Sequence, residues 1–158
     1  MDNKGFTLIE LVVVIVILGI LAVTAAPKFM NLKADAQTST LHGVQAAMQG
    51  SSALVYGKSI VKGNHTLSAS DNPTVEIADG EFISINFGYP TISVSDWQEH
   101  LLDIDLTVFA IANTIDSAVV VYLKENDKPL SFQQACLSYY RSSAKEGERP
   151  TTGTNPCS

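Results

Sequence analysis

Apolar and polar positions divide the chain into an apolar N-terminal stretch and a longer part in which the two kinds alternate. Apolar residues run almost continuously from Phe6 to Ala26, and Glu10 is the one charged residue among them. As a helix rising about 1.5 Å per residue, this stretch is roughly 31 Å long, which matches a hydrocarbon core about 30 Å thick. The pattern predicts a membrane-spanning helix over residues 6–27 with a carboxylate near its start.

The periodicity beyond Pro27 predicts that an amphipathic helix continues over about residues 28–57. Four apolar residues at seven-residue steps form one face, expected to pack on a sheet: Ala34, Leu41, Met48 and Val55. A second seven-residue series puts small residues on another stripe: Ala36, Gly43, Gly50 and Gly57. Such a stripe allows close approach of another backbone, although tolerated glycines are equally consistent with it. Gly57 is expected to end the helix as its C-cap.

Two residues make one part of the long helix weak. Gly19 costs about 1 kcal/mol relative to alanine, and Pro27 removes a backbone hydrogen bond and clashes with the preceding turn. The segment between them is the weakest part of the helix, with a gentle kink expected at Pro27.

The remaining residues predict a small antiparallel sheet and hence an α+β fold in one globular domain over residues 28–158. A polar loop is expected over 58–72. Strands are predicted over 74–77, 81–87, 117–123 and within 132–141, a short helix over 94–104, and irregular structure over 142–158. The run 117–123 is expected to be a central strand.

Charge and cysteine content narrow the function classes. The net charge of −6 gives no general attraction for nucleic acid, so no nucleic-acid partner is expected. The two cysteines, Cys136 and Cys157, lie far behind a membrane segment, which favours a disulfide in an oxidising compartment. Free thiols in a cytosolic protein are the alternative.

Catalytic and metal-binding patterns are missing from the sequence, so neither an enzyme nor a cofactor is expected. The three histidines lack ligand-like spacing, and there is no phosphate-binding loop or nucleophile elbow. Asp103, Asp105 and Asp116 are interpreted as a solvated acidic loop rather than a calcium site. Trp97 and the pair Tyr139-Tyr140 are interpreted as core residues rather than sugar contacts.

Three interpretations of the N-terminus differ in how they treat Glu10. A cleaved secretory signal, cut before Ala26, and a plain membrane anchor both leave this carboxylate unexplained. The run Gly5-Phe6-Thr7-Leu8-Ile9-Glu10 with its apolar continuation resembles the N-terminal motif of type IV prepilins and pseudopilins.

The resemblance implies a maturation and assembly route. Residues 1–5 would be a leader that a dedicated prepilin peptidase cuts after Gly5, and the same enzyme would methylate Phe6. Glu10 would pair with the α-amino group of Phe6 on a neighbouring subunit. The subunit would wait in the inner membrane and be packed by an assembly machinery there into a helical filament of identical subunits. Backbone between Gly19 and Pro27 would be extended in the filament and helical in the isolated subunit.

Further motifs are similar to those of the mannose-sensitive haemagglutinin pilins. These are the run from Glu10 to Asn31, the tripeptide Gly88-Tyr89-Pro90 and the C-terminal cysteine pair. This resemblance implies a Cys136–Cys157 disulfide and a major pilin of a Gram-negative bacterium, acting in surface adhesion, haemagglutination and biofilm formation, with a surface glycan as an expected ligand. The alternatives are a type II secretion pseudopilin, a minor pilin, or a membrane-anchored periplasmic binding domain or enzyme.

Overall fold

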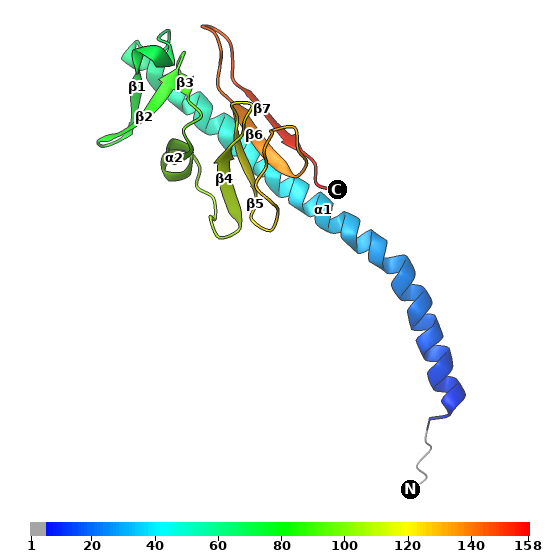
Figure 1. Cartoon of the computed structure of the whole chain (residues 1–158). Helices are drawn as coiled ribbons and strands as arrows, with labels where there is room; N and C mark the ends of the chain where they lie inside the picture. The colour runs from blue at the N-terminus through cyan, green and yellow to red at the C-terminus, as the bar shows by residue number, and fades with distance from the viewer. Residues whose placement is uncertain (1–5) are drawn as a thin grey trace.

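A long helix carries two small antiparallel sheets along its C-terminal half, while its N-terminal half extends beyond them (Figure 1). The computed structural model describes residues 6–158, and for residues 26–31 it describes the backbone alone. The predicted leader 1–5, including Gly5, lies outside the described residues. The arrangement confirms the α+β class: an apolar N-terminal helix followed by antiparallel strands.

The helix α1 spans Leu8–Lys62, and its backbone is helical without a break through Gly19 and Pro27 (Figure 1). It curves gently along its length. Residues Leu8–Ala25 are long and apolar enough to cross a membrane, with a mean hydropathy of 3.0. Extension of the Gly19–Pro27 backbone concerns the assembled filament and stays a prediction.

The prediction that Gly57 ends the helix was wrong. The residue that leaves the helical conformation is Gly63, with φ of 77°, and its N–H donates to the last carbonyls of the helix. Packing explains the extra turn: the Lys58 Nζ donates to the Ile77 carbonyl at 2.7 Å and the Lys62 Nζ to the Thr74 carbonyl at 2.8 Å. These bonds hold residues 58–62 in helical register against the first sheet.

The first sheet has the order β1-β2-β3 and follows the short helical turn η1 (Ala69–Asp71). Its strands are β1 (Thr74–Ala78), β2 (Glu81–Asn86) and β3 (Tyr89–Pro90). The first two confirm the predicted strand pair and its intervening turn. The helix predicted over 94–104 is present but shorter, as α2 (Val94–Asp96) continued by the π-helical turn η2 (Trp97–Leu101).

The second sheet has the order β4-β5-β6-β7. Its strands are β4 (Phe109–Asn113), β5 (Val119–Leu123), β6 (Leu137–Arg141) and β7 (Thr151–Asn155). Every residue of β5 is buried, which confirms its central position. The prediction of irregular structure over 142–158 was wrong, because β7 pairs with β6 across five residue pairs.

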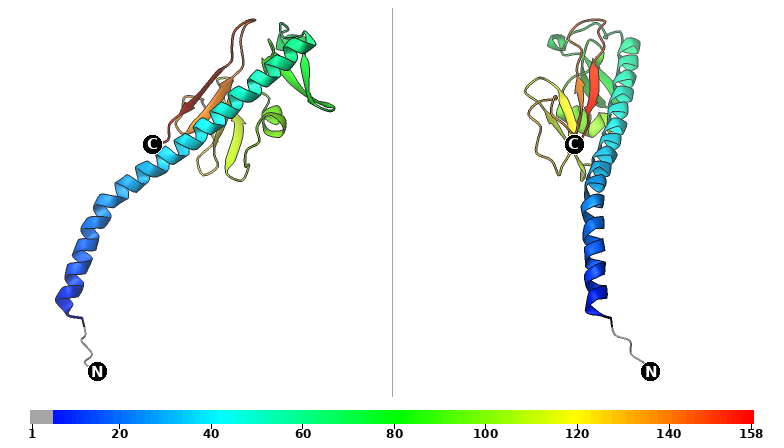
Figure 2. Two further views of the ribbon diagram at one scale, coloured as in Figure 1. Left: turned by 180° about the vertical axis from the view of Figure 1, so that it is seen from behind. Right: turned by 90° about the vertical axis from the view of Figure 1, so that its right-hand side faces the viewer.

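Both sheets lie on the same side of α1, and no element within residues 6–158 covers its opposite side (Figure 2). The predicted seven-residue face of the helix supplies the buried side: Leu41 and Met48 are fully buried and Val55 nearly so. The core that they share with the sheets also includes Val75, Ile83, Ile85, Trp97, Val119, Val121 and Tyr140. A hydrogen bond from the Ser138 hydroxyl to the Leu41 carbonyl, at 2.6 Å, fastens β6 to this face.

Candidate functional site

At the start of α1, the Glu10 carboxylate accepts hydrogen bonds from Thr7 of the same chain. The Thr7 backbone N–H and hydroxyl both donate to Glu10 Oε2, at 2.8 and 2.7 Å, and the Glu10 N–H donates to Thr7 Oγ1 at 3.3 Å. This reciprocal pair is a capping box, which satisfies N–H groups that the first helical turn leaves free. Beside it, the Phe6 side chain is 91% exposed. Glu10 is therefore hydrogen-bonded within the single chain, close to the backbone at which cleavage is predicted.

The apolar stretch that follows has no covering element among the described residues. No residue of Leu8–Ala25 is buried, and its large side chains are exposed all round the helix. The Thr24 hydroxyl donates to the Leu21 carbonyl at 3.0 Å, so this polar group is satisfied inside the helix. A helix that is apolar all round needs lipid or other helices as its surroundings.

The small-residue stripe lies on the uncovered side of α1. Ala36, Gly43, Gly50 and Gly57 are all exposed, and a Cβ added at any of the three glycines would meet nothing within 4 Å. Leu54 and Val61 flank the stripe and are 73% and 90% exposed. The sequence-based prediction of the stripe did not include Leu54 and Val61, although Ala47, Leu54 and Val61 form a further seven-residue series. The helix thus has a second, open face of small and aliphatic side chains.

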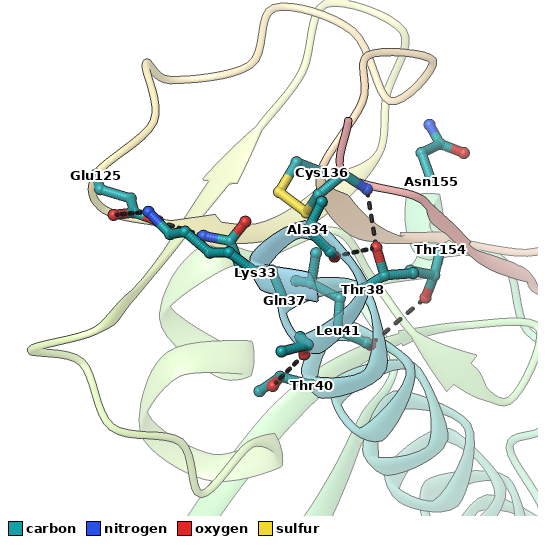
Figure 3. Close-up of a disulfide and its surroundings, with 12 residues drawn as sticks. Lys33, Ala34, Gln37, Thr38, Thr40, Leu41, Glu125, Cys136, Thr154 and Asn155 are labelled. Carbon is teal, nitrogen blue, oxygen red and sulfur yellow. Dashed lines mark hydrogen bonds and ion pairs between the residues drawn. A yellow bond between two sulfur atoms is a disulfide. The ribbon is translucent and has the colours of Figure 1, made fainter. Parts of the chain in front are cut away.

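The two C-terminal cysteines lie at the β6–β7 side of the second sheet, next to α1. A disulfide joins Cys136, just before β6, to Cys157, just after β7. The Cys157 backbone N–H donates to Thr38 Oγ1 at 2.9 Å, and Thr154 Oγ1 lies 3.4 Å from the Leu41 carbonyl (Figure 3). Glu125 from the β5–β6 loop accepts hydrogen bonds from Lys33 and Gln37 of α1 (Figure 3). The C-terminal segment is therefore tied to the helix at several points.

Other candidates from the sequence do not form sites. Trp97 and Tyr140 are fully buried and pack on each other with ring centroids 4.5 Å apart, as core residues do. Within the described part of the chain, no three His, Cys, Asp or Glu side chains are placed to hold a metal ion. Asp105 instead accepts hydrogen bonds from the Thr107 hydroxyl and N–H, which lower the pKa of its carboxyl.

Comparisons with known proteins agree on a family. Residues 1–26 match the family model described as the prokaryotic N-terminal methylation motif. A fimbrial protein of Pseudomonas aeruginosa is 32% identical over 130 residues, covering 79% of this chain and 81% of that protein.

Two further relatives match over the N-terminal part. The type IV narrow pilus major component of Thermus thermophilus is 44% identical over 54 residues, which is 34% of this chain and 47% of that protein. The type IV major alpha-pilin of Moraxella bovis is 39% identical over 72 residues, 44% of this chain and 45% of that protein. No solved structure matches the chain.

Proposed function

The chain belongs to the type IV pilin family, and from that premise we propose that it is the major subunit of a pilus of the mannose-sensitive haemagglutinin type. As a pilin it is a structural subunit and not an enzyme, anchored by its apolar helix in a membrane and assembled into surface pili. The observation that carries the proposal is the helix itself. No other part of the described chain covers Leu8–Ala25, and this stretch, with Glu10 as its one charged residue, lies within the matched methylation motif.

The proposed maturation makes a new charge beside that carboxylate. Cleavage after Gly5 by a prepilin peptidase would leave the Phe6 amine as the N-terminus, which the same enzyme methylates and which stays cationic. Glu10 of a neighbouring subunit would pair with this amine. Two opposite charges in apolar surroundings cost far less together than apart, so the pair selects one axial register between subunits.

The proposed filament packs the open face of α1 against helices of other subunits. Support comes from the glycines of the stripe, where an added Cβ would meet nothing within 4 Å apart from the helix's own backbone, so that another backbone can approach closely. The inner-membrane assembly machinery would supply subunits from the bilayer to the filament. Extension of the backbone between Gly19 and Pro27 would let the apolar segments fit around one another there.

The subtype rests on the resemblance of the run from Glu10 to Asn31 and of two features of the C-terminal half of the chain. The Cys136–Cys157 disulfide distinguishes the chain from most type II secretion pseudopilins, and Gly88-Tyr89-Pro90 is similar to the haemagglutinin pilins. Surface adhesion, haemagglutination and biofilm formation in a Gram-negative bacterium are the proposed roles. A minor pilin is the second candidate, and the abundance of the chain in sheared filaments separates the two.

The deciding experiment is mass spectrometry of the mature N-terminus. A species that begins with N-methylated Phe6 is expected. A species that begins at Met1 would instead mean an uncut anchor, and one that begins at Ala26 would mean an ordinary secretory signal; either result would remove the basis of the proposed assembly.

A further inference from the structure

A groove lies between α1 and the β6–β7 loop. This loop lies at the end of the molecule far from the apolar segment (Figure 1). The volume of the groove is about 550 Å³, within the usual range for small-molecule sites. α1 contributes Gln49, Ser52 and Tyr56, which lie on one helix face because they are three and four residues apart. Tyr89 of β3, Arg149 of the loop and Thr152 of β7 form the other wall.

The aromatic wall of the groove is held rigidly. Tyr56 and Tyr89 stack with ring centroids 4.4 Å apart and planes 11° from parallel. Gly88 permits this stack: its φ is 84°, and a Cβ there would lie 2.8 Å from the Tyr56 ring. Behind Tyr89, the Pro90 carbonyl accepts a hydrogen bond from the Tyr140 hydroxyl at 2.8 Å. The tripeptide Gly88-Tyr89-Pro90 therefore holds the Tyr89 ring in place against α1.

The polar groups of the groove are largely unused by the protein. The Ser52 side chain is 3% exposed, and its hydroxyl has no hydrogen-bond partner in the described part of the chain. A buried hydroxyl without a partner costs free energy, which a ligand hydroxyl or a small shift toward the nearby Tyr140 hydroxyl would relieve. Gln49 uses its amide N–H on Thr152 Oγ1 at 2.7 Å, which leaves its carbonyl oxygen available.

The charge of the groove selects the ligand class. Arg149 is exposed and forms no ion pair within residues 6–158, although the chain as a whole carries a net charge of −6. A guanidinium binds a carboxylate through two parallel hydrogen bonds. An aromatic wall suits the C–H face of a sugar ring, and the serine, threonine and glutamine suit its hydroxyls.

From this geometry we propose that the groove binds a pyranose sugar that carries a carboxylate, with Arg149 on the carboxylate and the Tyr56–Tyr89 stack along the ring. The biological setting rests on the proposed adhesive pilus, whereas the binding itself is a property of the single chain. Trp97 and Tyr140 are buried core residues, as the sequence predicted, and the half-buried Tyr56 and Tyr89 are the aromatic residues that line the groove.

Titration of the full-length chain in detergent micelles tests the site by ¹⁵N NMR, with methyl glucuronoside as ligand and methyl glucoside as its neutral counterpart. Saturable shifts at the Tyr89 and Thr152 amides are expected for the glucuronoside, with at least about tenfold weaker binding of the glucoside. Arg149→Gln should lose the preference, and Arg141→Gln, which removes a charge outside the groove, should keep it. Equal binding of both sugars, absence of saturation, or an unaffected Arg149→Gln variant would overturn the proposal.

Two further measurements separate the site from other roles. Ser52→Ala should weaken glucuronoside binding and keep or raise the unfolding midpoint, because it removes a buried hydroxyl without a partner and alanine favours the helix. A lowered midpoint with unchanged binding would make Ser52 structural and refute its role. Arg149→Gln cells should still form filaments in electron micrographs. If only that variant lost them, the groove would be a subunit contact and the sugar proposal would fail, whereas absence of filaments from the wild type would count against the pilus itself.

Discussion

Replacing two glycines on the open face of α1 with leucine should stabilise the single chain and impair assembly of the filament. Gly43 and Gly50 lie inside the regular helix, exposed, with no atom within 4 Å of an added Cβ. Changing both to leucine therefore meets no obstacle in the isolated chain. In the proposed filament, the same side chains would lie where another backbone has to approach.

The expected magnitudes follow from helix propensity and packing. Glycine in an exposed helix interior is about 0.8–1 kcal/mol less favourable than alanine, and leucine is close to alanine, so the double variant should be more stable by about 1.5 kcal/mol. In the filament, extra methylenes in a close helix contact cost typically about 1–3 kcal/mol at each site. Because every subunit repeats the cost, assembly should fail although the subunit folds better.

The assay compares urea unfolding of the full chain in micelles with the yield of sheared pili. The double alanine variant is the matched control, because it gains the same helix propensity with a single methyl group per site and should retain most of its filaments. Filaments at the wild-type level in the leucine variant would show that the stripe is not a contact. A destabilised leucine variant would show instead that the stripe already packs within the single chain.

Three further changes test other parts of the chain. Glu10→Val should insert into the membrane at least as well as the wild type and yet give few sheared pili; normal piliation would remove the proposed charge pairing. Replacing both Cys136 and Cys157 by serine should lower the free energy of unfolding by about 3 kcal/mol, since the bridge closes a loop of 21 residues; an unchanged urea midpoint would mean that β6–β7 pairing alone closes the segment. Met48→Ala should cost about 2–5 kcal/mol because the side chain is fully buried in the helix–sheet core, and a loss below about 1 kcal/mol in urea unfolding would mean that the core collapses around the gap.

The parts of the fold that periodicity determines could be predicted from the sequence. The seven-residue series through Leu41 and Met48 gives the buried face of α1, because only one face of a helix can meet the sheets. The β-branched run in β5 gives the central strand, since all five residues are buried. Both patterns reflect burial, which is the strongest signal that a sequence carries.

Elements held mainly by their neighbours could not be predicted. β7 is a polar edge strand of threonine, glycine and asparagine, and its conformation depends on pairing with β6 and on Gly153, where an added Cβ would lie 2.5 Å from the Tyr139 hydroxyl. The last turn of α1 likewise depends on lysine contacts with β1. In both places a contact between residues distant in sequence decides the local structure.

The groove was hidden from sequence reasoning for the same reason. Tyr56 and Tyr89 belong to different elements, and their stacking depends on the backbone approach that Gly88 allows. The unpartnered Ser52 hydroxyl follows from burial, which spacing in the sequence cannot reveal. In the sequence, only the tripeptide Gly88-Tyr89-Pro90 pointed to this region, and it did not indicate that Tyr89 stacks on Tyr56 of the helix.

The Thr7–Glu10 capping box explains how a carboxylate can be both tolerated in the single chain and useful in the filament. Before assembly, Glu10 has two hydrogen bonds from Thr7 and needs no partner. A neighbouring amine competes with these bonds only where its Coulomb attraction is strong, and that attraction grows as the surrounding dielectric falls. At the hydrated membrane surface, where Glu10 lies near the start of the span, the free energy gained from the charge pair is small, whereas among packed apolar helices it is large. We therefore expect the charge pair to form as the helices come together, so that register is fixed by assembly and not before it.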